Sequence, residues 1–193
     1  FGMVGHSNLG LADAIRREEE AGPLRFIGIR HEGAASFACS AYGKLTGRPA
    51  ACLSIAGPGA TNLLTGLWDA NVDRSPVLAL TGQVDTQVLG PGAFQEIDLT
   101  AAFGKVAQWS QPVLHSSRHA ELMTLACKSA LLNRGVSHLI FPDEVQNLEA
   151  PDTPAGGPAG RITVREIAPP ATALSDAVTL LGKSRRPVMI VGH

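Results

Sequence analysis

The chain has 193 residues, 45% of them hydrophobic, which is enough to bury a substantial core and excludes an intrinsically disordered protein. Its 16 basic and 17 acidic residues give a net charge of −1, without the basic excess that binding to nucleic acid or to an anionic membrane requires. The three cysteines, Cys39, Cys52 and Cys127, have neither metal-site nor disulfide-framework spacing, so we expect reduced thiols in a cytoplasmic protein.

Short apolar runs alternate with longer helical patterns along the chain. Six runs predict strands, over residues 1–5, 24–29, 50–55, 77–80, 106–110 and 139–141. The patterns between them predict helices that begin at about residue 8 and cover residues 32–45, 60–70 and 119–133. Because parallel neighbours need crossover connections, this alternation predicts an α/β fold with a doubly wound, mainly parallel sheet and helices on both faces. No apolar run reaches the roughly 18 residues of a transmembrane helix, so none is expected.

The sequence predicts one complete domain and the start of another. Residues 1–149 hold the alternating pattern, and residues 150–170 are rich in Pro and Gly, which is typical of a linker. Residues 171–193 contain a predicted helix over 173–181 and a predicted strand over 187–191. We interpret this last stretch as the truncated start of a further domain, and the chain as a fragment.

Four loops are candidates for a ligand site, because ligands of such sheets bind beyond the carboxyl ends of the strands. They cover residues 5–8, 30–32, 56–62 and 81–95. The third contains Gly57-Pro58-Gly59-Ala60-Thr61-Asn62, between a strand and a helix. Its glycines either expose backbone N–H groups to a ligand or only satisfy the geometry of a tight turn.

Glu32 lies at a predicted strand end, where an Ala-rich helix begins. Its carboxylate is either a favourable charge in the first helical turn or a group held in a poorly hydrated pocket and aimed at a ligand nitrogen. Phe94 and Gln95, after a Gly-Pro-Gly loop, suit either a substrate lip or a loop anchored by one aromatic ring. The histidines share no metal-ligand spacing and no serine lies in a Gly-x-Ser-x-Gly elbow, so neither a metal site nor a hydrolase triad is expected.

Several motifs follow one another in a fixed order: Phe-Gly-x-x-Gly at the first strand, Arg30-His31-Glu32, and the segments 41–47, 57–62, 73–76, 81–84 and 94–96. Together they resemble the N-terminal pyrimidine-binding domain of thiamine-diphosphate-dependent decarboxylases and carboligases. The branch that contains acetolactate synthase, pyruvate oxidase and sulfoacetaldehyde acetyltransferase is the most similar. The resemblance covers about residues 1–148, and residues 180–192 resemble the opening of that family's central domain.

This resemblance implies a catalytic role for Glu32. In the family, the equivalent glutamate hydrogen-bonds N1′ of the cofactor's aminopyrimidine and promotes loss of the C2 proton of the thiazolium. The reaction that follows is decarboxylation of a 2-keto acid such as pyruvate, with the cofactor as electron sink. By the same resemblance, the cofactor is bound by Pro58, Gly59 and Asn62, and the substrate is contacted by His6, Ser7, Phe94 and Gln95.

The resemblance also implies groups and partners outside these residues. Mg²⁺ and the diphosphate of thiamine diphosphate would be held by a C-terminal domain that is absent here, and FAD is possible in the full-length protein. A homodimer or tetramer would form through the pyrimidine domain. We therefore expect the fragment to be inactive alone. The alternative to an enzyme is a non-catalytic, doubly wound module that binds a nucleotide or regulates a partner.

Overall fold

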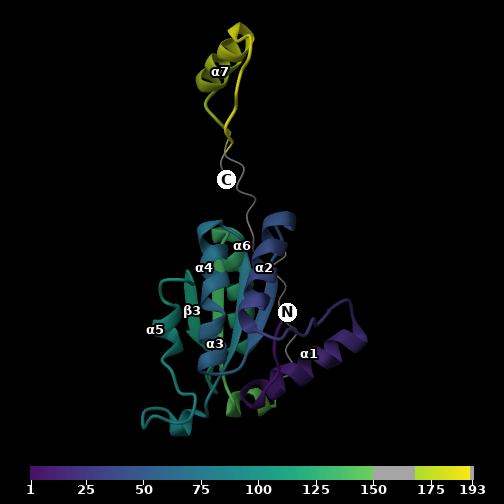
Figure 1. Cartoon of the computed structure of the whole chain (residues 1–193), viewed down its shortest axis with the longest axis vertical. Coiled ribbons are helices and arrows are strands. Elements are labelled where there is room, and N and C mark those ends of the chain that lie inside the picture. Colours follow the sequence, from purple (N-terminus) through teal and green to yellow (C-terminus); the bar gives the residue numbers. More distant parts are fainter. Residues whose placement is uncertain (150–167, 192–193) are drawn as a thin grey trace. The chain divides into compact units, whose positions relative to one another are not determined.

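The computed structural model of the chain describes residues 1–149 and 168–191, which belong to two separate units. Within residues 1–149 the centre is a four-stranded, all-parallel sheet (Figure 1). In spatial order its strands are β1 (Ala50–Ser54), β2 (Val77–Gln83), β4 (Val136–Pro142) and β3 (Trp109–Pro112). The central strands β2 and β4 are almost wholly buried, as expected when both faces of a sheet are covered. The predicted doubly wound, parallel α/β fold is confirmed.

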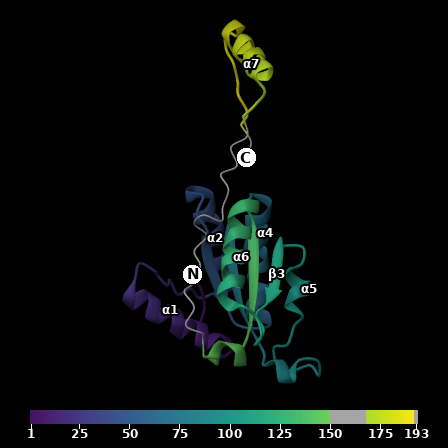
Figure 2. The ribbon, with the colours of Figure 1, turned by 180° about the vertical axis from the view of Figure 1, so that it is seen from behind.

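Helices cover both faces of this sheet, as the opposite views in Figures 1 and 2 show. One face carries α2 (Glu32–Thr46), α3 (Pro58–Asn62), α4 (Leu64–Val72) and α5 (Leu99–Phe103). The opposite face carries α6 (His119–Asn133), with side chains of α1 (Leu9–Ala21) beside it.

The strands separate two hydrophobic cores. Successive residues of β2 alternate between them: Val77 and Ala79 pack toward α2 and α4, whereas Leu78 and Leu80 pack toward α6. On the first face α2 and α4 approach each other closely at Gly66, where a Cβ atom would come within 2.3 Å of a side-chain oxygen of α2. The small residues of the Ala-rich helix therefore serve close helix packing.

Beyond β1, two predicted strands are reduced to single bridges. Gly2 lies between Gly28 and Leu53 and forms an isolated parallel bridge with each of them. Backbone hydrogen bonds of 2.9–3.1 Å join this segment to both neighbours. The strands predicted over residues 1–5 and 24–29 are thus too long. The first ends early because the chain turns into the 3-10 helix His6–Asn8, and the second pairs only at Gly28.

Other boundaries also differ from the predictions. The helix predicted over 60–70 is divided into α3 and α4, because Leu63 bonds to the carbonyl three residues back and so forms a tighter turn. Strands β2 and β4 are longer than predicted, and β3 lies at 109–112 rather than 106–110. The short helix α5 was not predicted, whereas the helix over 119–133 is confirmed to the residue.

A buried histidine connects three strands of the sheet. His138, on β4, has no solvent-exposed surface, and its Nε2 lies 2.8 Å from Oγ1 of Thr81 on β2. Its Nδ1 lies 2.8 Å from Oγ of Ser110 on β3, and its ring stacks on Phe103 with centroids 3.8 Å apart. A neutral imidazole has one N–H and one acceptor nitrogen, so the two hydroxyl groups satisfy it completely.

The second unit contains α7 (Ala171–Lys183), which confirms the helix predicted over 173–181. The strand predicted over 187–191 is wrong: these residues are irregular, and residues 168–191 contain no strand with which they could pair. Most of the linker predicted over 150–170 lies outside the described residues, and the division of the chain into domains stays a prediction. None of the described helices combines the length and apolarity needed to cross a membrane.

Candidate active site

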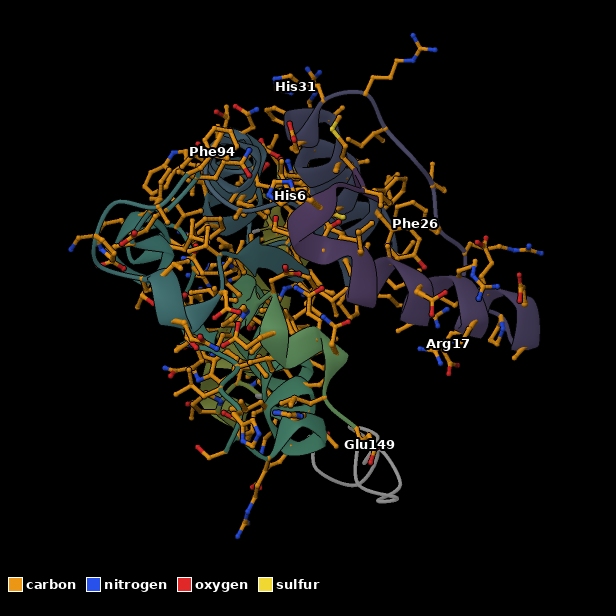
Figure 3. All side chains as sticks on the ribbon, turned by 90° about the horizontal axis from the view of Figure 1, so that it is seen from below. His6, Arg17, Phe26, His31, Phe94 and Glu149 are labelled. Atoms are coloured by element: carbon orange, nitrogen blue, oxygen red, sulfur yellow. The ribbon has the colours of Figure 1, made fainter. Side chains whose placement is uncertain are left out.

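The predicted site residues come from loops at the carboxyl end of the sheet. Residues 1–3 and β1 are neighbours, and the connections that leave them run to opposite sides, which is the kind of switch point where such sheets bind ligands. Figure 3 views this end from below, with His6, His31 and Phe94 labelled there and Arg17 farther out on α1.

Glu32 occupies the first position of α2 and is only 6% exposed. The helix starts at this point because His31, in an extended conformation, caps it: His31 Nδ1 accepts a hydrogen bond of 3.1 Å from Gly33 N. The orphan N–H groups of the first turn favour a negative charge here. The carboxylate is therefore held at a helix end but buried under its neighbours.

Asn62 and Gly59, both on α3, define the surroundings of the Glu32 carboxylate. Asn62 Nδ2 donates a hydrogen bond of 3.0 Å to Glu32 Oε2. Among the described residues, the Glu32 carboxylate accepts no other hydrogen bond. On the other side, a Cβ atom at Gly59 would come within 3.1 Å of Glu32 Oε1 and 2.5 Å of Ile55. The glycine thus leaves open the space beside Oε1 that any side chain would fill.

The turn that starts α3 requires its first glycine. Gly57 has φ +62°, and Pro58 follows at the first helical position, which suits its fixed φ. A Cβ atom at Gly57 would lie 2.7 Å from the carbonyl oxygen of Gln95. Gln95 itself has φ +67°, an unusual value for a residue with a side chain. The loop after β2 therefore rests directly on the glycine turn.

The remaining predicted residues contribute in different ways. Phe94 is 82% exposed at the tip of the loop that carries Gln95, and His6 is exposed on the 3-10 helix His6–Asn8. Ser7 is buried, and its Oγ accepts a hydrogen bond of 2.8 Å from Ala56 N, next to the glycine turn. The structure thus brings Glu32, Gly59 and Asn62 into contact, while Ser7 reaches the site through the backbone that it holds.

One supporting residue was not predicted. Gln146 Nε2 donates to the carbonyl of Ser7 at 2.9 Å, and its Oε1 accepts from Leu11 N at 3.2 Å. It thereby fixes the loop after the first strand from a position about 140 residues away along the chain. In the sequence Gln146 stands among other polar residues, between Glu144 and Asn147, so no local signal distinguishes it.

The family of the chain follows from its similarity to known proteins. The model of the N-terminal TPP-binding domain of thiamine pyrophosphate enzymes matches residues 1–102. The chain belongs to the thiamine pyrophosphate enzymes. Thiamine pyrophosphate is the same compound as thiamine diphosphate, so the predicted family is confirmed.

Curated relatives of this thiamine pyrophosphate enzyme domain are longer than the chain. An acetolactate synthase of Arthrospira platensis is 37% identical over the whole chain, which covers 34% of that protein. Acetolactate synthase 2, chloroplastic, of Zea mays is 36% identical over the whole chain, which covers 30% of it. A putative thiamine pyrophosphate-containing protein of Bacillus subtilis is 40% identical over 75% of the chain and 25% of its own length. The chain spans about a third or less of these relatives.

The residues at the glycine turn fit the pyrimidine part of thiamine pyrophosphate. The group to be recognised is a flat heterocycle with a ring nitrogen, and the chain presents a buried carboxyl whose Oε1 borders the space left by Gly59. Among the described residues, no group of three or more His, Cys, Asp or Glu side chains could hold a metal ion.

Proposed function

We propose that this domain holds the aminopyrimidine of thiamine diphosphate in an enzyme that decarboxylates a 2-keto acid such as pyruvate and transfers or releases the product. The observation that carries the proposal is the Glu32 carboxyl, which is buried, held on one oxygen by Asn62 and open on the other beside Gly59. When bound, the cofactor supplies a carbon nucleophile and an electron sink for the keto acid.

Glu32 would hold the proton that is shared with the N1′ ring nitrogen. The hydrogen bond from Asn62 fixes Oε2, so the carboxyl group presents Oε1 in one orientation. Burial excludes water that would otherwise compete for the same proton. A proton between a carboxyl oxygen and a weakly basic ring nitrogen then moves over a short, fixed path, which is the geometry that general acid–base catalysis requires.

The other predicted residues would shape the two ends of the site. Pro58, Gly59 and Asn62 would line the pyrimidine through the shape of the turn. Phe94 and Gln95, on the loop that rests on Gly57, would face the keto acid, and His6 and Ser7 would approach from the first-strand loop. Glu32 alone would act in the chemistry.

The full-length enzyme would contain further parts. We infer that Mg²⁺ and the diphosphate are held by a C-terminal domain, that any FAD binds in the central domain, and that the enzyme is cytoplasmic. The relatives that cover the chain are about three times its length, which supports such additional domains. Residues 1–193 alone would be inactive.

We also infer that the enzyme is a homodimer or a tetramer, assembled through the outer face of α2 and α4. That face exposes large apolar side chains, Phe37, Leu45, Trp68 and Val72, on two helices that pack against each other. Helix α2 begins at Glu32 and α4 begins two residues after Asn62, so this face starts beside the site. Burial of several such side chains is the usual driving force of a stable interface.

Replacing both Phe37 and Trp68 by serine removes two large apolar side chains from the interface. The dimer dissociation constant of the full-length protein is therefore expected to rise at least about tenfold. Light scattering after size exclusion over a concentration series measures this. The matched control is Leu125→Ser on α6, an exposed leucine on the opposite face. A double variant that remains as dimeric as the control would contradict the assignment of this face.

The proposed function is tested with the chain extended to its natural ends. Calorimetry with thiamine diphosphate and Mg²⁺ is expected to show binding to the full-length protein and none to residues 1–193, since the fragment lacks the diphosphate site. With pyruvate, the full-length protein is expected to release CO₂. Absence of cofactor binding to the full-length protein would overturn the proposal, and binding without CO₂ release would exclude pyruvate as substrate.

A further inference from the structure

Glu96 lies directly after Phe94 and Gln95, the two residues predicted to face the substrate. Its carboxylate accepts three backbone hydrogen bonds from the loop that precedes it: from Gly90 N at 2.7 Å, Gly92 N at 3.0 Å and Ala93 N at 2.8 Å. Its own N–H donates to the Ala93 carbonyl at 2.9 Å. One side chain thus closes residues 90–96 into a compact loop.

The donors hold Glu96 in its charged form. The three backbone N–H groups lower the pKa of the Glu96 carboxyl below its ordinary value. Hydrogen bonds to an ionised acceptor are stronger than those between neutral groups, and a carboxylate with two oxygens can serve three donors at once. Gly90 and Gly92 both have positive φ and lie outside any helix or strand. Without Glu96, water would be the acceptor for their N–H groups.

The same loop packs closely against the glycine turn of the site. Gln95 adopts φ +67° and its backbone and Cβ lie against Gly57, whose own φ is +62°. A residue with a side chain keeps such a conformation only when its surroundings enforce it. Here the neighbouring Glu96 carboxylate supplies this constraint, since its three backbone hydrogen bonds fix the loop just before Gln95.

The side-chain amide of Gln95 has a buried oxygen that accepts no hydrogen bond from the described residues. Its Oε1 is buried and, within residues 1–149 and 168–191, it is one of two buried side-chain atoms without a hydrogen-bond partner, together with Ser137 Oγ. A buried acceptor without a donor has a free-energy cost, so it gains from any donor that enters the site. Phe94, its neighbour, points into solvent from the same closed loop.

We propose that Glu96 is the positioning residue of the substrate side: it fixes the loop 90–96 so that Phe94 and Gln95 meet the keto acid in one arrangement against the Gly57 turn. This inference rests on the proposed function. Glu96 does not touch the reacting atoms. Its removal frees the loop, and the substrate must then order that loop on binding.

Glu96→Gln in the full-length protein tests this role. Gln keeps the size of the side chain but turns an NH₂ group toward N–H donors, so at least one of the three hydrogen bonds is lost. We expect the KM for pyruvate to rise about tenfold while kcat and the affinity for thiamine diphosphate change less than about threefold, because substrate binding now includes the ordering of the loop. Glu121→Gln is the control, since Glu121 is an exposed residue of α6 that contacts only Arg118 among the described interactions.

Hydrogen exchange supplies a readout that does not depend on activity. In Glu96→Gln the amides of Gly90, Gly92 and Ala93 are expected to exchange at least about tenfold faster than in wild type, with no change in β2. Unchanged exchange in the loop would overturn the proposal, and so would faster exchange with an unchanged KM. A full-length wild-type protein that does not bind thiamine diphosphate would instead overturn the proposed function, and the loop exchange would still report whether Glu96 fixes the loop.

Discussion

Glu32→Gln in the full-length protein is expected to lower turnover of a 2-keto acid by about 10²- to 10⁴-fold, the usual contribution of a positioned acid–base group. The amide has the same shape and still accepts the hydrogen bond from Asn62, but it cannot release a proton to a ring nitrogen. Thiamine diphosphate affinity is expected to stay within about tenfold, because shape and burial are retained. Steady-state CO₂ release and calorimetry on the same preparation measure both quantities.

The control for this variant is Glu121→Gln, which also removes one carboxylate but lies on α6, away from the glycine turn. Its turnover is expected to equal that of wild type. Thermal unfolding of both variants establishes that each is folded. If Glu32→Gln kept full turnover, Glu32 would be only a favourable charge in the first turn of α2. If the wild type bound a nucleotide in place of thiamine diphosphate and turned over no 2-keto acid, the domain would be the non-catalytic module.

Acid is expected to destabilise the chain through His138. Burial lowers the pKa of His138 to about 3 from its ordinary value of 6.5. Between these values the unfolded chain binds a proton that the folded chain does not, so the free energy of unfolding falls as the pH decreases from about 6.5 toward 3. One proton corresponds to about 1.36 kcal/mol per pH unit, which amounts to about 1.5 kcal/mol between pH 6.5 and pH 5. The contribution becomes complete and constant only well above pH 6.5, where the unfolded histidine is also neutral.

Urea unfolding of residues 1–193 at several pH values between 5 and 6.5 measures this effect. In this range most carboxylates of the unfolded chain stay ionised, since their ordinary pKa values lie near 4. His138→Gln removes the titrating group, so its free energy of unfolding is expected to have a slope smaller by about one proton. His115→Gln replaces an exposed histidine and should keep the wild-type slope. Equal slopes in all three proteins would contradict a neutral His138 in the fold.

The sequence predicted the layers of the fold because its signals are local. Continuous apolar runs and helical patterns alternate, and each run is long enough to identify its element. What it could not predict depends on distant partners. Gly2 forms bridges on two sides but the chain then leaves the sheet, so a strand-like sequence becomes a single pair of bridges. The length of β2 depends on pairing with β4, which lies about 60 residues away along the chain.

The part of the candidate site in which residues of the sequence motifs contact one another could be predicted. Glu32 and the turn that carries Gly59 and Asn62 are recognisable in the sequence, and the structure brings them into hydrogen-bond contact. The supporting contacts were not predictable. Gln146 reaches Ser7 from the far end of the domain, and Glu96 closes its loop only because two glycines adopt positive φ. Such contacts depend on backbone conformation, which residue type alone does not determine.

The bridged edge of the sheet bears on how long the folded protein resists proteolysis. No residue of α1 is fully buried, and the stretch that follows it joins the sheet mainly through the bridge between Gly2 and Gly28. We therefore expect this edge to open at a lower free energy than the buried strands β2 and β4, and its opening would disturb the start of α2, where Glu32 lies. If Glu32 holds the cofactor as proposed, bound cofactor would oppose that opening by mass action. Cofactor supply would then govern how fast cellular proteases remove the protein, in addition to how fast it works.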